Sequence, residues 1–298
     1  SYMDGILEIF KMTHCNPSRT PAQATILDAE ALRRTDTEND ILYPVDQVVG
    51  SIQYLVGATR PDIATACNLL ARYQTTKSKR TWKHAMDILR YVKSSSDDGL
   101  SFKCNDINEM KLVAYYDASH ADCTISRKST TGYVVFFGAC PISWHMGRER
   151  SNSISVTESE CQALIKVTTE VTWLGYILEE ITQVVNKAGA QIPTDIYPIP
   201  VYGDNNGSMF LAQSEGKSHQ KTKHIDVKFH FVRQQFMRSI IDVLHVPGSL
   251  NVADAMTKPL GPNIFHQYKG ILLGKEKPWH LTDDGIQYIK TQHQTRAA

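Results

Sequence analysis

The chain has 298 residues, a formal net charge of +1 at pH 7, 42% hydrophobic residues and 21% charged residues. This composition is typical of a globular protein and excludes an intrinsically disordered chain, and no uninterrupted apolar run approaches the ~20 residues of a membrane-spanning helix. A net charge near zero gives no global attraction to polyanions, so contacts with nucleic acid would have to come from local clusters of Lys and Arg. The six cysteines are far apart and form no CxxC pair, which indicates reduced thiols in a cytosolic or nuclear protein.

The first hundred residues are predicted to hold an arm and a helical segment. Residues 1–40 form the expected extended arm or linker, because much of this stretch is polar, charged and interrupted by prolines. Residues 41–99 form the expected helical segment, with apolar residues at helical spacing in successive stretches. Pro61 suits the first turn of one helix, and "SKRTWKHAMDILRYVK" predicts a basic amphipathic one. The sequence "SSSDDG" marks the boundary with the next unit.

Between residues 100 and 275 the apolar pattern changes to strand spacing and predicts an α/β domain. Four short strands rich in aromatic and β-branched residues come first, at "SFKCND", "LVAYYDAS", "TGYVVFFG" and "PISWHM". A long helix, a strand, two helices, the strand "IIDVLHVPG" and a helix starting near Asn251 complete the order. This order is that of a sheet layered with helices. Residues 276–298 are expected to be a C-terminal tail.

The predicted strand "LVAYYDAS" ends its apolar run on a carboxylate, Asp117. Burying a carboxylate without a partner is so unfavourable that the group becomes protonated instead. Asp117 therefore requires a cation, a set of hydrogen-bond donors or a metal ion. A turn-initiating aspartate is the simpler alternative.

Three later acids have comparable positions. Glu160 lies in the stripe of the long helix that should face the sheet, although Thr157 and Glu160 also match the spacing of a capping box. Asp204 follows a strand and could be an N-cap, and Asp254 could cap the helix that begins near Asn251. Together the four acids favour one site, because ligands of open α/β sheets bind beyond the carboxyl ends of the strands. Their oxygen atoms would suit Mg²⁺ or Mn²⁺ rather than zinc.

Five stretches of the sequence stand in a characteristic order, namely "YYDASHADCTISRKSTTGYVVFFG", "SVTESECQAL", "VYGDNNGSMFLAQ", "TKHIDVKFHFVR" and "VPGSLNVADAMTKPL". They resemble the ribonuclease H domain of copia-type LTR retrotransposon polyproteins. The upstream "YPVDQVVGSIQYLVGATRPDIATACNLLARY", followed by "WKHAMDILRYVK", resembles the segment that joins this domain to the reverse transcriptase. The resemblance implies a ribonuclease H-like mixed five-stranded sheet flanked by helices, preceded by a smaller, mainly helical segment.

The resemblance also implies a metal-dependent endonuclease that cuts the RNA strand of an RNA/DNA hybrid and leaves 5′-phosphate and 3′-hydroxyl ends. Its motifs assign two Mg²⁺ or Mn²⁺ ions to Asp117, Glu160, Asp204 and Asp254, and Asp117 would bridge both ions. The expected partners are the hybrid and the reverse transcriptase palm and fingers of the same polyprotein, without a membrane. The expected location is the cytoplasm, in a virus-like particle, or the nucleus. The chain has no YxDD motif of a polymerase site.

Nucleic-acid contacts are expected from small polar residues beside the acids and from basic residues. The former could read the 2′-hydroxyl of RNA, and the latter could contact phosphates, although a solvated surface charge is the simpler alternative for any one of them. The first set is Ser119, Gln162, Asn205 and Asn206; the second is Arg127, Lys128, Arg148, Arg150, Lys221 and Lys223. His224, in the family motif "KHID", is expected to contact nucleic acid or to be structural. It lies six residues from His230, on a different helix face, so zinc is not expected there.

Two alternative functions remain open. A catalytically silent or domesticated copy would keep the fold and the nucleic-acid surface but would not cut. A nuclease or integrase of similar architecture that acts on DNA would usually rely on three acids in a different arrangement. One departure bears on activity: many cellular ribonucleases H have a histidine in the loop before the last acid, whereas this loop reads "PGSLN" and His245 precedes it.

Overall fold

The computed structural model describes residues 1–21, 43–76, 78–103, 109–123, 125–189, 192, 194–214 and 223–297. For 223–228 and 295–297 it describes the helical backbone alone. Residues 22–40 of the expected extended arm, and Lys221, lie outside the described residues.

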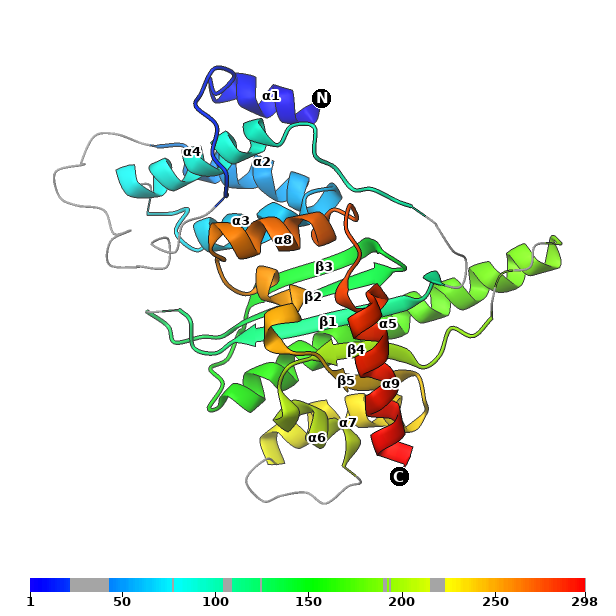
Figure 1. Ribbon diagram of the computed structural model, residues 1–298. Helices are drawn as coiled ribbons and strands as arrows, with labels where there is room; N and C mark the ends of the chain where they lie inside the picture. Colours follow the sequence, from blue (N-terminus) through cyan, green and yellow to red (C-terminus); the bar gives the residue numbers. More distant parts are fainter. Residues whose placement is uncertain are drawn as a thin grey trace.

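A mixed five-stranded sheet lies at the centre of the molecule (Figure 1). The strands are β1 (Leu112–Ser119), β2 (Thr130–Phe137), β3 (Cys140–Arg148), β4 (Ile199–Gly203) and β5 (Ile241–His245). Their order is β3-β2-β1-β4-β5, with β2 antiparallel to both β1 and β3, and with β4 parallel to both β1 and β5. The predicted α/β fold class, a mixed five-stranded sheet flanked by helices, is confirmed. The strand expected at 101–106 was wrong for 101–103, which form no strand, and 104–106 lie outside the described residues.

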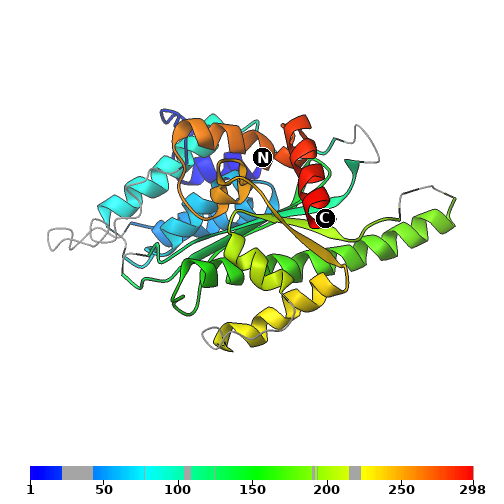
Figure 2. The same cartoon turned by 60° about the horizontal axis from the view of Figure 1, so that its bottom comes forward.

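One face of the sheet is covered by α5 (Val156–Lys187), α6 (Asn206–Gln213) and α7 (Lys223–Met237). The inward stripe of α5, which includes Leu164, Val167 and Val171, is fully buried against β1 and its neighbours. Figure 2 shows α5 running along this face, with α7 on its outer side. The long apolar stripe in the sequence thus corresponds to the helix that covers the middle of the sheet.

The opposite face is covered by both ends of the chain (Figures 1 and 2). The elements of the N-terminal part are α1 (Tyr2–Ile9), α2 (Val45–Ala58), η3 (Pro61–Ile63), α3 (Ala64–Ala71) and α4 (Lys79–Ser94). Those of the C-terminal part are η6 (Gly248–Leu250), η7 (Val252–Met256), α8 (Pro262–Leu272), η8 (Trp279–Leu281) and α9 (Asp283–Ala297).

Two expectations about these elements were wrong. Residues 2–9, expected to be extended, are helical because Ser1 and Asp4 form a capping box that satisfies the first free N–H groups. The helix expected to start near Asn251 is instead a pair of short 3₁₀ helices followed by α8. Pro259 and Gly261 stand between η7 and α8, where a proline interrupts the helical hydrogen bonds.

The side chains of β1 alternate between the two faces. Leu112 and Tyr116 belong to the core beneath α5, whereas Val113 and Tyr115 belong to the core on the opposite face. Burial on both faces explains why this strand reads as a near-continuous apolar run. The same alternation places Asp117 on the face of Val113 and Tyr115, where η7 lies.

Polar contacts fix the helical segment to the sheet. The indole N–H of Trp144 on β3 donates to the carbonyl of Val56 at 2.8 Å. Arg72 on α3 forms an ion pair with Asp122 at 3.0 Å, and the two side chains are only 6% and 9% exposed. The Thr65 hydroxyl on α3 donates to the carbonyl of Ala255 on η7.

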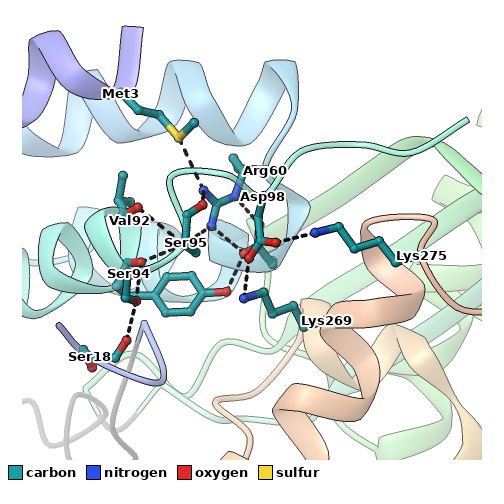
Figure 3. A network of polar contacts seen from close by, with 11 residues as sticks. Met3, Ser18, Arg60, Val92, Ser94, Ser95, Asp98, Lys269 and Lys275 are labelled. Atoms are coloured by element: carbon teal, nitrogen blue, oxygen red, sulfur yellow. Dashed lines mark hydrogen bonds and ion pairs between the residues drawn. The ribbon is translucent and has the colours of Figure 1, made fainter. Parts of the chain in front are cut away.

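A second network joins the helical segment to α8 (Figure 3). The fully buried Arg60 donates to both carboxylate oxygens of Asp62 at 2.8 Å, and the Tyr91 hydroxyl donates to the same carboxylate at 2.6 Å. Asp98, just beyond α4, forms an ion pair with Lys269 of α8 at 2.6 Å. The N-terminal and C-terminal parts of the chain are therefore linked through charged groups as well as apolar ones.

Candidate metal centre

Asp117 lies near the C-terminal end of β1, the central strand, and is only 4% exposed. On β2 the residue opposite Asp117 is Gly132. A Cβ atom at Gly132 would lie 2.5 Å from the Cβ of Met256, so the missing side chain allows η7 to pack directly on β2. This close approach brings Thr257 to Asp117, and the Thr257 hydroxyl donates a hydrogen bond to Asp117 Oδ2.

The structure brings Asp117, Glu160 and Asp204 together. A carboxylate oxygen from each lies within 4.8 Å of those of the other two. Glu160 reaches the site from the start of α5, and Asp204 from the end of β4, which is parallel to β1. Glu160 is 4% exposed, and its Oε2 has no hydrogen-bond partner in the structure.

The N-terminal caps of these helices are formed by neighbouring residues and not by the acids themselves. The N-cap of α5 is Ser155, whose hydroxyl accepts a hydrogen bond from the Glu158 N–H at 3.1 Å. The N-cap of α6 is Asn205, whose side chain accepts from the Ser208 N–H at 2.9 Å. Asn251 caps η7 through the Ala253 N–H at 3.2 Å. Glu160, Asp204 and Asp254 are therefore not needed as N-caps.

Burial and repulsion between carboxylates raise the pKa values of Glu160 and Asp204. Burial, followed by the charges of Asp117 and Asp204, raises the pKa of Glu160 to about 9. Burial and Asp117 also raise the pKa of Asp204. Carboxylates in this situation either hold protons or require a cation between them.

Asp254 lies beside the cluster but outside the group of three acids. It forms an ion pair with Lys258, four residues later, at 2.8 Å. Burial and the charge of Asp117 raise the pKa of Asp254 to about 6, although Lys258 acts in the opposite direction. Sequence reasoning missed both Lys258 and Thr257, although the four-residue spacing of an acid and a lysine was a signal for the first.

The donor atoms fit a hard divalent cation. All four side chains offer carboxylate oxygens, which Mg²⁺ and Mn²⁺ prefer. Glu160 Oε2 is a buried acceptor without a donor, and such an atom is satisfied by a cation in the cluster. The chemistry of the residues therefore matches the predicted metal better than zinc, which favours Cys and His.

Transposon polyproteins are similar to this chain over most of its length. The retrovirus-related Pol polyprotein from transposon RE2 of Arabidopsis thaliana is 33% identical over 221 residues, which are 74% of this chain and 14% of that protein. The Pol polyprotein from transposon TNT 1-94 of Nicotiana tabacum is 30% identical over 274 residues, which are 91% of this chain and 20% of that protein. Copia-type retrovirus-related Pol polyproteins of transposons are thus homologous to most of this chain. It spans a fifth or less of the length of these two Pol relatives.

Other comparisons add little to the Pol assignment. No protein-family model matches the chain. Among solved structures, LC11-RNase H1 in complex with an RNA/DNA hybrid is 15% identical, covers 49% of this chain and 94% of its own, and gives a TM-score of 0.33. Among the described residues of the chain, no helix is both long enough and apolar enough to cross a bilayer.

The predicted nucleic-acid residues fall into four groups. Ser119, Asn205 and Asn206 lie at strand and helix ends next to the acids; Asn206 is exposed, and the amide oxygen of Asn205 already caps α6. Arg127 and Lys128 lie in the loop between β1 and β2. Only the helical backbone is described for Lys223 and His224, and Lys221 lies outside the described residues.

The fourth group, Gln162, Arg148 and Arg150, lines a cavity of about 630 Å³ between β3 and α5. Lys166, also in its wall, is already paired with Glu149 at 2.6 Å. Arg148 and Arg150 are exposed at the end of β3. The cavity thus has two exposed guanidinium groups near the first turns of α5, the helix that carries Glu160.

Proposed function

We propose that this chain is a metal-dependent ribonuclease H, which cuts the RNA strand of an RNA/DNA hybrid for a copia-type transposon. The observation that carries the proposal is the convergence of Asp117, Glu160 and Asp204 within 4.8 Å at the ends of a ribonuclease H-like sheet. Similarity to transposon Pol polyproteins over most of the chain supports this reaction class. The reverse transcriptase of the same polyprotein is the proposed partner.

Asp117, Glu160, Asp204 and Asp254 are the proposed ligands of two Mg²⁺ or Mn²⁺ ions. Divalent ions held there would supply a nucleophilic water and would stabilise the leaving oxygen, giving 5′-phosphate and 3′-hydroxyl ends. Asp117 is the proposed shared ligand, because it lies on the central strand with the other acids around it. Thr257 holds the Asp117 carboxylate through its hydroxyl and so fixes the direction of its oxygens.

The hybrid is proposed to cross the strand ends where the acids lie. Ser119 and Asn206 are close enough in sequence to Asp117 and Asp204 to contact the 2′-hydroxyl of the RNA strand. Arg148 and Arg150, at the cavity between β3 and α5, are suited to phosphates of the same duplex. Phosphate contacts of this kind supply affinity without sequence preference.

The decisive experiment is cleavage of a labelled RNA strand in an RNA/DNA hybrid with Mg²⁺ or Mn²⁺. Wild type should cut the hybrid and leave an all-DNA duplex intact, and Asp204→Asn should lose the activity. Asp195→Asn is the matched control, because Asp195 is exposed and pairs with Lys111 away from the cluster. Hybrid binding without cleavage by wild type would instead support a silent binding module, and cleavage of the DNA duplex would support the DNA nuclease.

A further inference from the structure

Lys258 places a positive charge among the four acids. Its ammonium group lies 2.8 Å from Asp254 Oδ1. Its charge also acts on Asp117 and Asp204, and it opposes the rise in the pKa of Glu160. In the protein without metal, the positive charge of this lysine therefore partly neutralises the negative charge of the carboxylate cluster.

We propose that Lys258 competes with the second of the two divalent ions for the carboxylate of Asp254. This inference rests on the proposed function, because it requires the acids to be metal ligands. Within the part of the chain that the structure describes, Asp117, Glu160 and Asp204 form a group without an ion pair, whereas Asp254 is paired. A divalent ion at Asp254 must displace the ammonium group or bind against its repulsion.

The two ions are therefore expected to bind with unequal affinity. The first binds the cluster of Asp117, Glu160 and Asp204, where Glu160 Oε2 has no partner to lose. The second requires Lys258 to release Asp254. Release is feasible, since the Lys258 side chain is 46% exposed and a lysine has a long flexible stem. A phosphate of the bound hybrid would offer Lys258 another anion and would favour the release.

The test is a calorimetric titration with Mn²⁺, without nucleic acid, of wild type, Lys258→Met and Lys258→Arg. Wild type should show one tighter and one weaker ion. Lys258→Met should strengthen binding of the weaker ion by roughly fivefold, because the competing ammonium group lies on a nearly half-exposed side chain and its ion pair is of modest strength, and should change binding of the tighter ion less. Lys258→Arg keeps the charge and should resemble wild type. Lys111→Met is the control, because Lys111 forms an ion pair with Asp195 and is similarly exposed.

Thermal unfolding provides a second readout that separates competition from packing. In the presence of a chelator, Lys258→Met should unfold at a lower temperature than wild type, because the acids lose the positive charge of the lysine. With saturating Mn²⁺ the difference should shrink or reverse, whereas a purely structural role would lower the unfolding temperature equally in both conditions.

Three outcomes would overturn the inference. Equal strengthening of both ions, or no change, would mean that Lys258 does not compete at Asp254 in particular. Weaker binding of the second ion to Lys258→Met would mean that the lysine supports that ion. Absence of any Mn²⁺ binding by wild type would overturn the proposed function itself, and this result is distinguishable from the others.

Discussion

At the scale of single residues, the clustered carboxyl groups destabilise the protein that holds no cation. The pKa of Glu160 is raised to about 9 by burial and by Asp117 and Asp204. The folded protein then holds a proton that the unfolded chain, with a pKa near 4.5, releases. Stability without metal is therefore greatest at acid pH as far as this group is concerned, and falls as pH rises from about 4.5 toward 9.

Asp204→Asn should stabilise the protein in the presence of a chelator at pH 8, because it removes a buried charge that repels Asp117 and Asp254. The expected gain is about 1 kcal/mol, which raises the unfolding temperature by about 2 °C in a chain of this size. Mg²⁺, which should raise the unfolding temperature of wild type, should have little effect on the variant. Differential scanning calorimetry with and without Mg²⁺ measures both. An Asp204→Asn protein that is less stable than wild type in chelator would contradict this account of the cluster.

At the scale of elements, the position of η7 on the sheet decides whether the fourth acid and Thr257 reach the site. A five-residue 3₁₀ helix has little stability of its own, so its place depends on packing. Gly132 on β2 provides that packing by leaving space for Met256. Thr65 on α3 holds η7 from the other side through the Ala255 carbonyl.

Gly132→Ala should push η7 away from β2, because the new Cβ would lie 2.5 Å from the Cβ of Met256 and 2.8 Å from its carbonyl oxygen. Overpacking of this kind lowers the free energy of unfolding by about 1–3 kcal/mol. Binding of the second Mn²⁺ ion should weaken as well, measured by the same titration as above. Gly57→Ala is the control, since a Cβ there meets nothing within 4 Å. Unchanged Mn²⁺ binding by Gly132→Ala would show that η7 does not depend on this contact.

The 3₁₀ helix η8 introduces a pH dependence of the opposite sign. His280 is buried under the sheet, its Nδ1 lies 2.9 Å from the Tyr115 hydroxyl, and burial lowers its pKa from 6.5 to about 3. A histidine with a lowered folded pKa contributes stability above the unfolded value near 6.5 and loses it as pH falls toward 3.

Replacing His280 by phenylalanine should flatten the acid side of the stability profile. Between pH 7.5 and pH 4.5, the free energy of unfolding of wild type should fall by about 2 kcal/mol more than that of His280→Phe. The reason is that unfolded wild type takes up a proton on His280, whereas the buried ring of the folded protein stays neutral. Urea unfolding at both pH values gives the comparison. The variant also loses the contact with Tyr115, which lowers its stability at both pH values, so the difference in slope is the relevant quantity. Parallel profiles would contradict this role of His280.

At the scale of the whole molecule, the sheet, its helices and the four acids could be predicted because they follow from strand and helix periodicity and from strand ends. Asp254 and Lys258 had a spacing signal for pairing, but the place of this pair beside the other acids could not be predicted, because it depends on how η7 packs on β2. The tail expected at 276–298 contains the helix α9, whose mostly polar sequence gives little periodic signal. This helix follows η8, whose Trp279 packs in the core on the η7 face of the sheet, a long-range contact that periodicity does not reveal.

The helical segment and the sheet should not be separable. Ala64 of α3 is part of the core on the η7 face, and the ion pair of Arg72 with Asp122 is more than nine-tenths buried. A fragment of residues 101–298 would leave Asp122 without its cation and expose the apolar residues that α3 covers, and breaking a buried ion pair alone costs about 3–5 kcal/mol. We expect this fragment to lack a cooperative unfolding transition in calorimetry. A fragment that unfolds cooperatively within a few degrees of the full chain would contradict this expectation.

The order of the acids along the chain has a genetic consequence. Asp117 and Asp204 lie on strands that pair only after α5 has been made, and Asp254 and Thr257 come from beyond β5. A gene copy with a stop codon anywhere between positions 205 and 253 encodes three of the acids but neither the fourth nor the threonine that holds the first. Nonsense mutations across this third of the domain should therefore all give the same phenotype, complete loss of function, whatever their distance from the site in sequence.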